Sequence, residues 1–276
     1  MKVIGVDFTS VPGKRKAITA AHGTLNGDEL TIQAIEALES FPEFEAFLER
    51  PGPWVAGFDF PFGLPRDAVK AFRWPQDWEA MVKRCAQLGK MRFAARLNKD
   101  RISRPFGNRY RFRRGDRIAG SSPAVRLHQV PVGFMFFEGA QRLARSSVNI
   151  PSMRENNSNR IALEAYPGYL AKSQLGIASY KSDERKKQTT YRRENRISIV
   201  KSIRNGKPLG IRLQATRALI ESLIEDATGD HLDSTICALQ AAWGWNRRNK
   251  NYGLPSELDP IEGWIVTVQN PGSYFS

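Results

Sequence analysis

The sequence is poor in the residues that crosslink small secreted domains or hold zinc. It has two cysteines, Cys85 and Cys237, and three histidines in 276 residues. The cysteines lie far apart in helical-looking segments, so we expect free thiols in a reducing compartment rather than a disulfide framework. No paired Cys/His spacing typical of a zinc site occurs. These absences predict a cytoplasmic protein without structural zinc.

Long apolar runs are also lacking. No uncharged apolar stretch approaches the roughly 18 residues that a membrane-spanning helix needs. The first seven residues lead directly into a strand-like pattern, so we expect no signal peptide. Apolar residues still make up 41% of the chain, enough for a sizeable core. We expect one domain over residues 1–276, with an insertion at about residues 76–150.

Acidic residues are outnumbered by basic ones. There are 28 Asp and Glu against 42 Lys and Arg, which gives a net charge of +14. The segment from Lys83 to Arg117 alone carries +11 and the segment from Lys181 to Lys207 carries +7, which leaves −4 for the rest of the chain. Such concentrated positive charge predicts a nucleic-acid partner, DNA or RNA. The alternative is that these segments are solvated helix faces.

The first basic segment contains an arginine-rich stretch, residues 101–117, that Pro105 and Gly107 interrupt. We interpret it as an exposed arm. Its arginines are expected to bind phosphates, and its aromatic residues either stack on unpaired bases or pack the arm onto its own domain. The candidate nucleic-acid contacts are Arg104, Arg109, Tyr110, Arg111, Arg113 and Arg114.

The order of the expected elements favours an α/β fold. Strands are predicted at residues 3–7, 16–21, 30–34, 54–59, 161–164 and 263–268, and helices at residues 42–50, 77–97, 131–144, 182–203, 211–224 and 230–245. The first three strands can form an antiparallel meander, and later strands can join it in parallel through helical crossovers. This is the element order of an RNase H-like mixed sheet flanked by helices, with a large basic helical insertion.

Three acids, Asp7, Asp59 and Glu164, each end a short apolar strand and precede a turn. The carboxyl ends of strands in α/β sheets face the ligand crevice, so acids placed there can converge. Asp7 and Asp59 are expected on adjacent central strands, about 4.8 Å apart. One metal ion could then bridge their side chains.

Two more acids, Asp230 and Asp233, lie three residues apart in the first turn of the last predicted helix and share a face. Either could instead cap the helix or complement its dipole. Carboxylates brought together repel one another, and a hard cation relieves that repulsion. Oxygen ligands suit Mg²⁺ or Mn²⁺, so we predict that Asp7, Asp59 and Asp233 bind one of these metals.

Five blocks of sequence, in order along the chain, are similar to a prokaryotic family. They are IGVDFT at residues 4–9, GFDFPFGLP at 57–65, EAYPG at 164–168, HLDSTICAL at 231–239 and EGWI at 262–265. The family that they resemble is the one catalogued as domain of unknown function 429 and described as predicted RNase H-like nucleases. The resemblance spans nearly the whole chain, except that the basic stretch 101–117 has no counterpart and Ser234 stands where alanine is expected.

The resemblance implies an RNase H-like fold and metal-dependent cleavage of phosphodiester bonds. It carries the family's four acids over to Asp7, Asp59, Glu164 and Asp233. The acid layout also resembles that of RuvC-type junction resolvases, which place two acids three residues apart on the last helix, as Asp230 and Asp233 are here. Glu164 is expected to be a metal ligand, an acid/base group or a structural acceptor.

Three functions are consistent with these features. The first is a Mg²⁺- or Mn²⁺-dependent nuclease acting on DNA or RNA, including structured or branched forms. Its catalytic candidates are Asp7, Asp59, Glu164, Asp230 and Asp233, and a branched substrate would predict a homodimer. The second is a non-catalytic nucleic-acid-binding protein on the same scaffold. The third is an actin-like nucleotide-dependent kinase, which the single core and the missing glycine-rich adenosine loop argue against.

Overall fold

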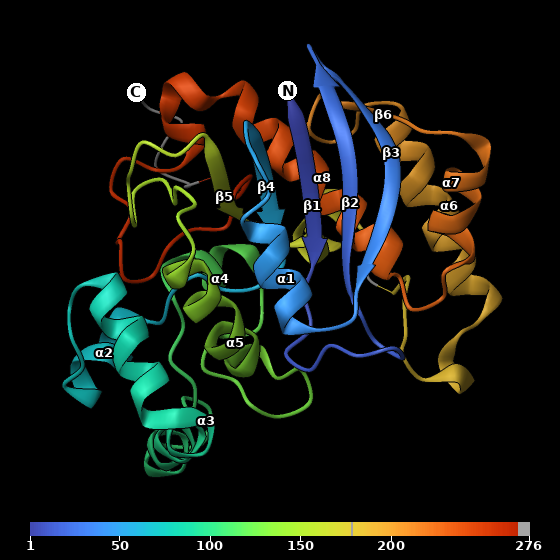
Figure 1. Cartoon of the computed structure of the whole chain (residues 1–276). Helices are drawn as coiled ribbons and strands as arrows, with labels where there is room; N and C mark the ends of the chain where they lie inside the picture. Colours follow the sequence, from blue (N-terminus) through green and yellow to red (C-terminus); the bar gives the residue numbers. More distant parts are fainter. Residues whose placement is uncertain (178, 270–276) are drawn as a thin grey trace.

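A six-stranded mixed sheet forms the centre of the protein (Figure 1). The structure, a computed structural model, describes residues 1–177 and 179–269. The strands run in the order β5-β4-β1-β2-β3-β6. Their bounds are β1 Lys2–Asp7, β2 Ile18–Asn26, β3 Glu29–Leu38, β4 Trp54–Phe58, β5 Arg160–Glu164 and β6 Arg212–Gln214.

The strand directions are those that the sequence predicts. β1, β2 and β3 form an antiparallel meander, and the turn between β2 and β3 contains Gly27 with φ of +59°, a conformation that glycine adopts readily. β4 pairs in parallel with β1, and β5 in parallel with β4. The predicted mixed α/β sheet with its meander and parallel strands is therefore confirmed.

Helices cover both faces of the sheet. Their bounds are α1 Phe41–Leu48, α2 Arg66–Phe72, α3 Trp78–Ser103, α4 Arg114–Ala119, α5 Val132–Arg145, α6 Thr190–Arg204, α7 Arg217–Glu225 and α8 Asp230–Asn246. Apolar residues of α1, α2, α3 and α5 share one core cluster with the sheet, and those of α6, α7 and α8 share another. The four helices α2 to α5 all lie between β4 and β5 in the chain and form the insertion (Figure 1).

The two cores follow the alternation of side chains along the central strands. In β1, Ile4 and Val6 belong to the first cluster and Val3 to the second. In β4, Phe58 belongs to the first cluster and Val55 to the second. Odd-numbered side chains of both strands therefore face α8, and even-numbered side chains face α1 and the insertion.

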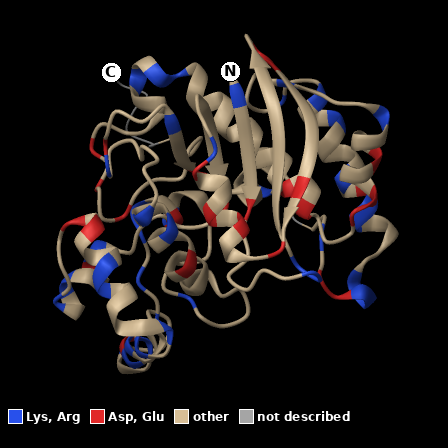
Figure 2. Cartoon of the chain, viewed as in Figure 1, with Lys and Arg blue, Asp and Glu red and all other residues tan. Residues whose placement is uncertain are grey.

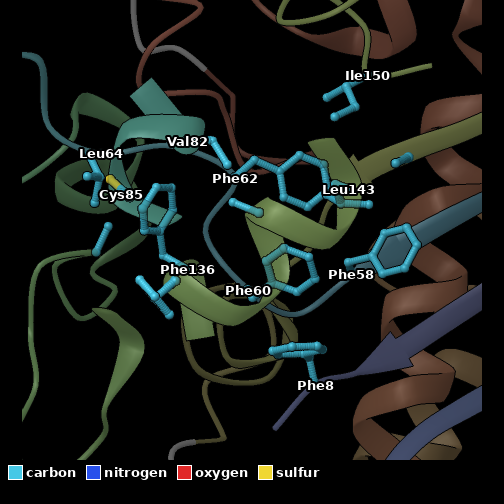
Figure 3. Packing of buried hydrophobic residues seen from close by; sticks show 14 of the residues in the cluster. Phe8, Phe58, Phe60, Phe62, Leu64, Val82, Cys85, Phe136, Leu143 and Ile150 are labelled. Carbon is cyan, nitrogen blue, oxygen red and sulfur yellow. The ribbon is translucent and has the colours of Figure 1, made fainter. Parts of the chain in front are cut away.

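The first core is rich in aromatic rings and joins the ends of the central strands to the insertion. Phe8, Phe58 and Phe60 are buried, and the ring centroids of Phe8 and Phe60 are 4.7 Å apart. Figure 3 shows these rings together with Phe62, and Phe136 of α5 belongs to the same core cluster. Because the turn after β4 inserts its own side chains into this core, it holds Asp59 in a fixed position.

Three of the predicted elements are wrong in detail. Residues 211–224 are not one helix but the short strand β6 followed by α7, because Thr216 caps a new helix by accepting a hydrogen bond from Leu219 N. The helix predicted from residue 182 begins only at Thr190, where Thr189 is the N-cap. Residues 263–268 form no strand and contribute one isolated bridge, from Ile265 to Glu164.

The stretch 101–117 is only partly an exposed arm. α3 continues to Ser103, and residues 114–119 form α4. Phe106 is 90% exposed, whereas Arg113 is buried at 2% exposure. Over residues 1–177 and 179–269, no helix is both long and apolar enough to cross a membrane.

Candidate active site at the ends of β1 and β4

Helix α8 lies directly on β1 and β4 because glycine replaces a side chain at each crossing. A Cβ atom at Gly5 would lie 1.9 Å from the Ser234 carbonyl oxygen, and one at Gly57 would lie 2.4 Å from the Cys237 carbonyl oxygen. Any larger residue at either position would push the helix away from the sheet. This close approach carries the first turn of α8 to the carboxyl ends of the two strands.

Asp7 and Asp59 lie side by side on the face that α8 covers. Val6 is paired with Phe58 in the parallel register, and Asp59 N donates a hydrogen bond of 2.9 Å to the Val6 carbonyl oxygen. Both aspartates have odd numbers, so the alternation of the strands points them toward α8. The prediction that they end adjacent central strands is confirmed.

Asp233 completes this group of acids from the helix side. Its side chain is fully buried, at 0% exposure, and its backbone N–H donates to the Gly229 carbonyl oxygen in the first turn. Asp230 does not cap the helix: the carboxylate of Asp226 accepts from His231 N at 2.9 Å and takes that role. Asp230 instead forms an ion pair of 2.7 Å with Lys16.

The surroundings of these three acids disfavour their charge: Asp7 and Asp233 are buried and Asp59 is half-buried. Burial raises the pKa of the Asp7 carboxyl well above its usual range, and the charges of Asp233 and Asp59 raise it further. Burial likewise raises the pKa of Asp59 to about 7, with a further contribution from Asp233. The pKa of Asp233 is also raised by burial. Asp7, Asp59 and Asp233 therefore form one electrostatic unit, which we call the acid cluster.

A lysine ammonium lies against the acid cluster. Lys181 Nζ forms an ion pair with Asp233, and Tyr180 Oη donates a hydrogen bond of 2.6 Å to the other oxygen of the same carboxylate. Although burial disfavours its charge, the carboxylates of Asp233, Asp7 and Asp59 hold the pKa of Lys181 well above its usual range. Because the Lys181 side chain keeps 41% exposure, the ammonium approaches the acids from the solvent side.

Helix α6 holds the segment that carries this lysine. Arg196 Nη1 donates to the Tyr180 carbonyl oxygen at 2.7 Å, and Arg192 donates to the Lys181 carbonyl oxygen. Arg196 itself is buried, at 3% exposure. Part of the second basic segment is thus structural, because its charges position Tyr180 and Lys181 rather than facing a partner.

The oxygen ligands of the acid cluster fit a divalent metal in type, although their positions do not form a complete coordination site. Its carboxylate oxygens are the ligands that Mg²⁺ and Mn²⁺ prefer, and their pKa values are raised first by burial and also by neighbouring carboxylates, whose repulsion a cation relieves. In the described ranges, no group of three or more His, Cys, Asp or Glu side chains is arranged to hold a metal. Lys181 supplies the compensating positive charge in this arrangement, so a metal ion would compete with the ammonium for Asp233.

Glu164 points to the other face of the sheet. β5 pairs with β4 so that Glu164 lies opposite Phe58, an even-numbered residue that faces the insertion. Arg113 binds both oxygens of Glu164, at 2.6 and 2.8 Å, and Phe62 N donates to it at 2.9 Å. Burial raises the pKa of the Glu164 carboxyl, and Arg113 opposes that rise. Among the three roles left open for Glu164, these contacts support the structural acceptor.

The candidate nucleic-acid contacts divide into side chains held inside the domain and side chains at the surface. The predicted phosphate contact of Arg113 is not supported, because its guanidinium is enclosed by Asp116 and Glu164. Arg111 is paired with Asp100 and Asp67 at 15% side-chain exposure, and Tyr110 packs against the first core.

The remaining arginines of the stretch reach the surface. Arg109 is exposed and lies over the ring of Phe106, 5.1 Å from its centroid, and Arg114 keeps 52% side-chain exposure. Arg104 is half-buried and donates to the Asn108 carbonyl oxygen. Figure 2 shows basic positions along α3 and around α6, with acidic positions at the end of β1 and the start of α8. Three of the six predicted contacts, Arg104, Arg109 and Arg114, can therefore reach a phosphate.

The comparisons with known proteins add nothing to this geometry. No family model, curated protein or solved structure matches the chain. The functional assignment consequently depends on the acids, on the cations around them and on the fold that brings them together.

Proposed function

We propose that this protein is a Mg²⁺- or Mn²⁺-dependent nuclease that hydrolyses phosphodiester bonds in DNA or RNA. The observation that carries the proposal is the acid cluster, in which carboxylates from two strands and a helix, two buried and one half-buried, lie together with pKa values raised first by burial. Burying repelling charges costs stability, and such perturbed groups gather at functional sites. The resemblance to the domain of unknown function 429 family supports the same assignment.

Each residue of the site has a role in this proposal. Asp7, Asp59 and Asp233 hold the metal, and Tyr180 orients Asp233 through its hydrogen bond. Bound Mg²⁺ or Mn²⁺ would polarise the scissile phosphodiester and activate the attacking water. Asp230, held by Lys16 next to the acid cluster, supports the metal site from its rim.

The experiment is incubation of the protein with a substrate panel, with Mg²⁺, with Mn²⁺ and with EDTA. The panel contains single-stranded, duplex, hybrid and branched DNA and RNA. We expect cleavage of at least one substrate with metal and none with EDTA. An intact panel under every metal condition would overturn the proposal.

A second candidate function, a non-catalytic nucleic-acid-binding protein, is favoured by one observation. Lys181 already compensates the charge of Asp233 without a metal, so the acids could be a stable internal ion-pair network. Binding that depends on salt, without metal-dependent cleavage, would assign this function. The kinase is less favoured, because the described residues contain one sheet rather than two copies of the core.

Metal binding provides a direct test of the competition between metal and Lys181. The variant Lys181→Met is expected to bind Mn²⁺ about tenfold more tightly, because the ammonium that competes for Asp233 is gone. Titration calorimetry measures the affinity without any substrate. The matched control is Lys186→Met, which removes an exposed charge of the same segment and should leave the affinity unchanged. Equal affinities in the two variants would show that Lys181 does not compete.

The solvent-accessible arginines of the stretch 101–117 should contribute electrostatic affinity. The double variant of Arg104→Ala and Arg109→Ala is expected to weaken binding of every nucleic acid and to reduce the slope of log affinity against log salt by about two. Fluorescence anisotropy at several salt concentrations measures that slope. The double variant of Arg212→Ala and Arg217→Ala, exposed arginines elsewhere on the surface, removes the same charge as a control. An equal fall of the slope in the two double variants would show that Arg104 and Arg109 have no specific role in binding.

Location and assembly belong to the same proposal. Both cysteines are free and buried, which is consistent with the reducing cytoplasm that we propose as the location. We propose a homodimer only for the case of a branched substrate, because two sites are needed to cut two strands. Light scattering of the purified protein, alone and with a branched substrate, tests the dimer: a monomer in both conditions would exclude it.

A further inference from the structure

A cavity of about 320 Å³ opens beside the acid cluster. Its lining includes Asp59 together with Tyr180 and Lys181, so it shares side chains with the proposed metal site. The volume is at the lower end of the range for ligand pockets, about 300–1,000 Å³. Whatever occupies the cavity lies next to the atoms at which the proposed cleavage takes place.

The apolar side chains of the cavity walls come largely from three separate parts of the chain. Phe60 and Pro61 follow β4, and Tyr166 follows β5. The insertion supplies the third wall with Val132 and Met135 of α5. These side chains are mostly apolar, so the walls suit a flat or compact apolar group rather than a hydrated ion.

The ring of Tyr166 is held in a defined place. A Cβ atom at Gly168 would lie 2.8 Å from the ring, so only glycine lets the ring lie against this backbone. Gln240 of α8 accepts from Tyr166 N at 3.0 Å and fixes the main chain. The tyrosine and the glycine of the EAYPG block thus together place an aromatic side chain in the cavity wall.

Besides the enclosed Arg113–Glu164 pair, which also lines the cavity, positive charge lies at two points. Lys181 is at the acid cluster, and Lys172 lines the cavity from the π-helix Tyr169–Gln174. Lys172 is exposed. π-Helical turns occur often at functional sites. An apolar, aromatic cavity between two ammonium groups complements a base attached to a charged sugar-phosphate backbone.

We propose that this cavity binds one unpaired nucleobase of a nucleic-acid strand whose neighbouring phosphate lies at the acid cluster. The inference rests on the proposed nuclease function and adds the substrate class. A base inside a duplex is stacked and paired and cannot enter, so the substrate is single-stranded at the cleavage point or has one nucleotide turned out of its helix. Aromatic side chains bind bases of any sequence through their faces, which predicts weak sequence preference.

The test measures base binding in EDTA, where no metal-dependent cleavage takes place. The probe is a short oligonucleotide, DNA or RNA, with one 2-aminopurine whose fluorescence reports the surroundings of that base. The single-stranded probe is expected to bind with a fluorescence change, and its fully paired duplex to bind at least about tenfold more weakly. Adenosine monophosphate as competitor distinguishes a free nucleotide from a strand.

Two variants change the lining of the cavity, and a third, outside the cavity, is the control. Met135→Trp fills it, and Tyr166→Leu removes the aromatic face; each is expected to weaken binding of the single-stranded probe about tenfold. Met91→Trp is the control, since Met91 is on α3 with 83% exposure. Tyr166→Leu keeps the test valid if Met135→Trp fails to fold, which circular dichroism reveals.

The outcomes separate this inference from the nuclease proposal. Equal binding of single strand and duplex, or unchanged binding in both cavity variants, would overturn the unpaired base. Competition by adenosine monophosphate at the affinity of the strand would also overturn it and assign the cavity to a free nucleotide. Loss of base binding in the two variants without metal-dependent cleavage in the wild type would keep the base site and reject the nuclease.

Discussion

Replacement of Asp7 by asparagine is expected to reduce metal-dependent cleavage at least about 100-fold, because loss of even a group that only orients a metal ligand costs 10- to 100-fold. Asparagine keeps the shape of the side chain and removes its charge. Burial and the neighbouring acids raise the pKa of Asp7, so the native carboxylate is held at a cost to the fold. The variant should therefore melt no lower than the wild type while it loses activity. Initial cleavage rates and thermal melting measured on the same preparation test both expectations.

The matched control for this variant is Asp28→Asn. Asp28 lies in the turn between β2 and β3, at the opposite end of the sheet from Asp7, with 61% side-chain exposure. The Asp28→Asn variant removes one negative charge, as Asp7→Asn does, and should leave cleavage unchanged. Cleavage that survives in the Asp7 variant would point to a contaminating enzyme or to a different site.

The sheet could be predicted from sequence because its signals are local. Short apolar runs that end at Asp7 and Asp59, with a tight turn at Gly27, define strands and a hairpin without reference to distant residues. The strand order then follows from the connections. β6 was missed because its three residues are too few to show alternation within a longer amphipathic pattern.

The division of the acids between the two faces could not be predicted, because it depends on the register between strands. Asp59 and Glu164 look alike in sequence, since both follow an apolar run and precede a proline-containing turn. In the structure Glu164 is paired with Phe58, one residue before Asp59. A difference of one residue reverses the direction of a side chain, so Asp59 faces α8 and Glu164 faces the insertion.

The cations that pair with the acids could not be predicted from local sequence, because they lie far from those acids along the chain. Lys181 and Asp233 are 52 residues apart, and Arg113 and Glu164 are 51 apart. Both cations belong to segments whose net charge predicted contact with nucleic acid. Composition shows that positive charge is present, but only the fold shows which basic side chains form ion pairs with internal carboxylates.

This distinction explains how a protein with net charge +14 can build an acidic site. Lys181 binds the buried carboxylate of Asp233, and Arg113 binds the buried carboxylate of Glu164. Lys181 remains accessible to solvent and would compete with a bound metal, whereas Arg113 is enclosed. The first arrangement is suited to exchange of cations and the second to permanent support of the turn after β4.

Replacement of Arg113 by alanine is expected to destabilise the fold by about 3–5 kcal/mol, because it leaves the carboxylates of Asp116 and Glu164 buried without a partner. For a chain of this size the melting temperature should fall by about 10 °C. The neighbouring variant Arg114→Ala, with 52% side-chain exposure, should cost no more than about 0.5 kcal/mol. Equal melting temperatures for the two variants would contradict the buried network.

A second change distinguishes support from catalysis at Glu164. Combining Arg113→Met with Glu164→Gln and Asp116→Asn removes all three charges together, so much of the lost stability should return. If Glu164 is a structural acceptor, the triple variant should also keep most of the metal-dependent cleavage, since the carboxylates of Asp7, Asp59 and Asp233 remain in place. A stable triple variant whose cleavage falls as far as that of Asp7→Asn would instead place Glu164 among the groups that act on the substrate.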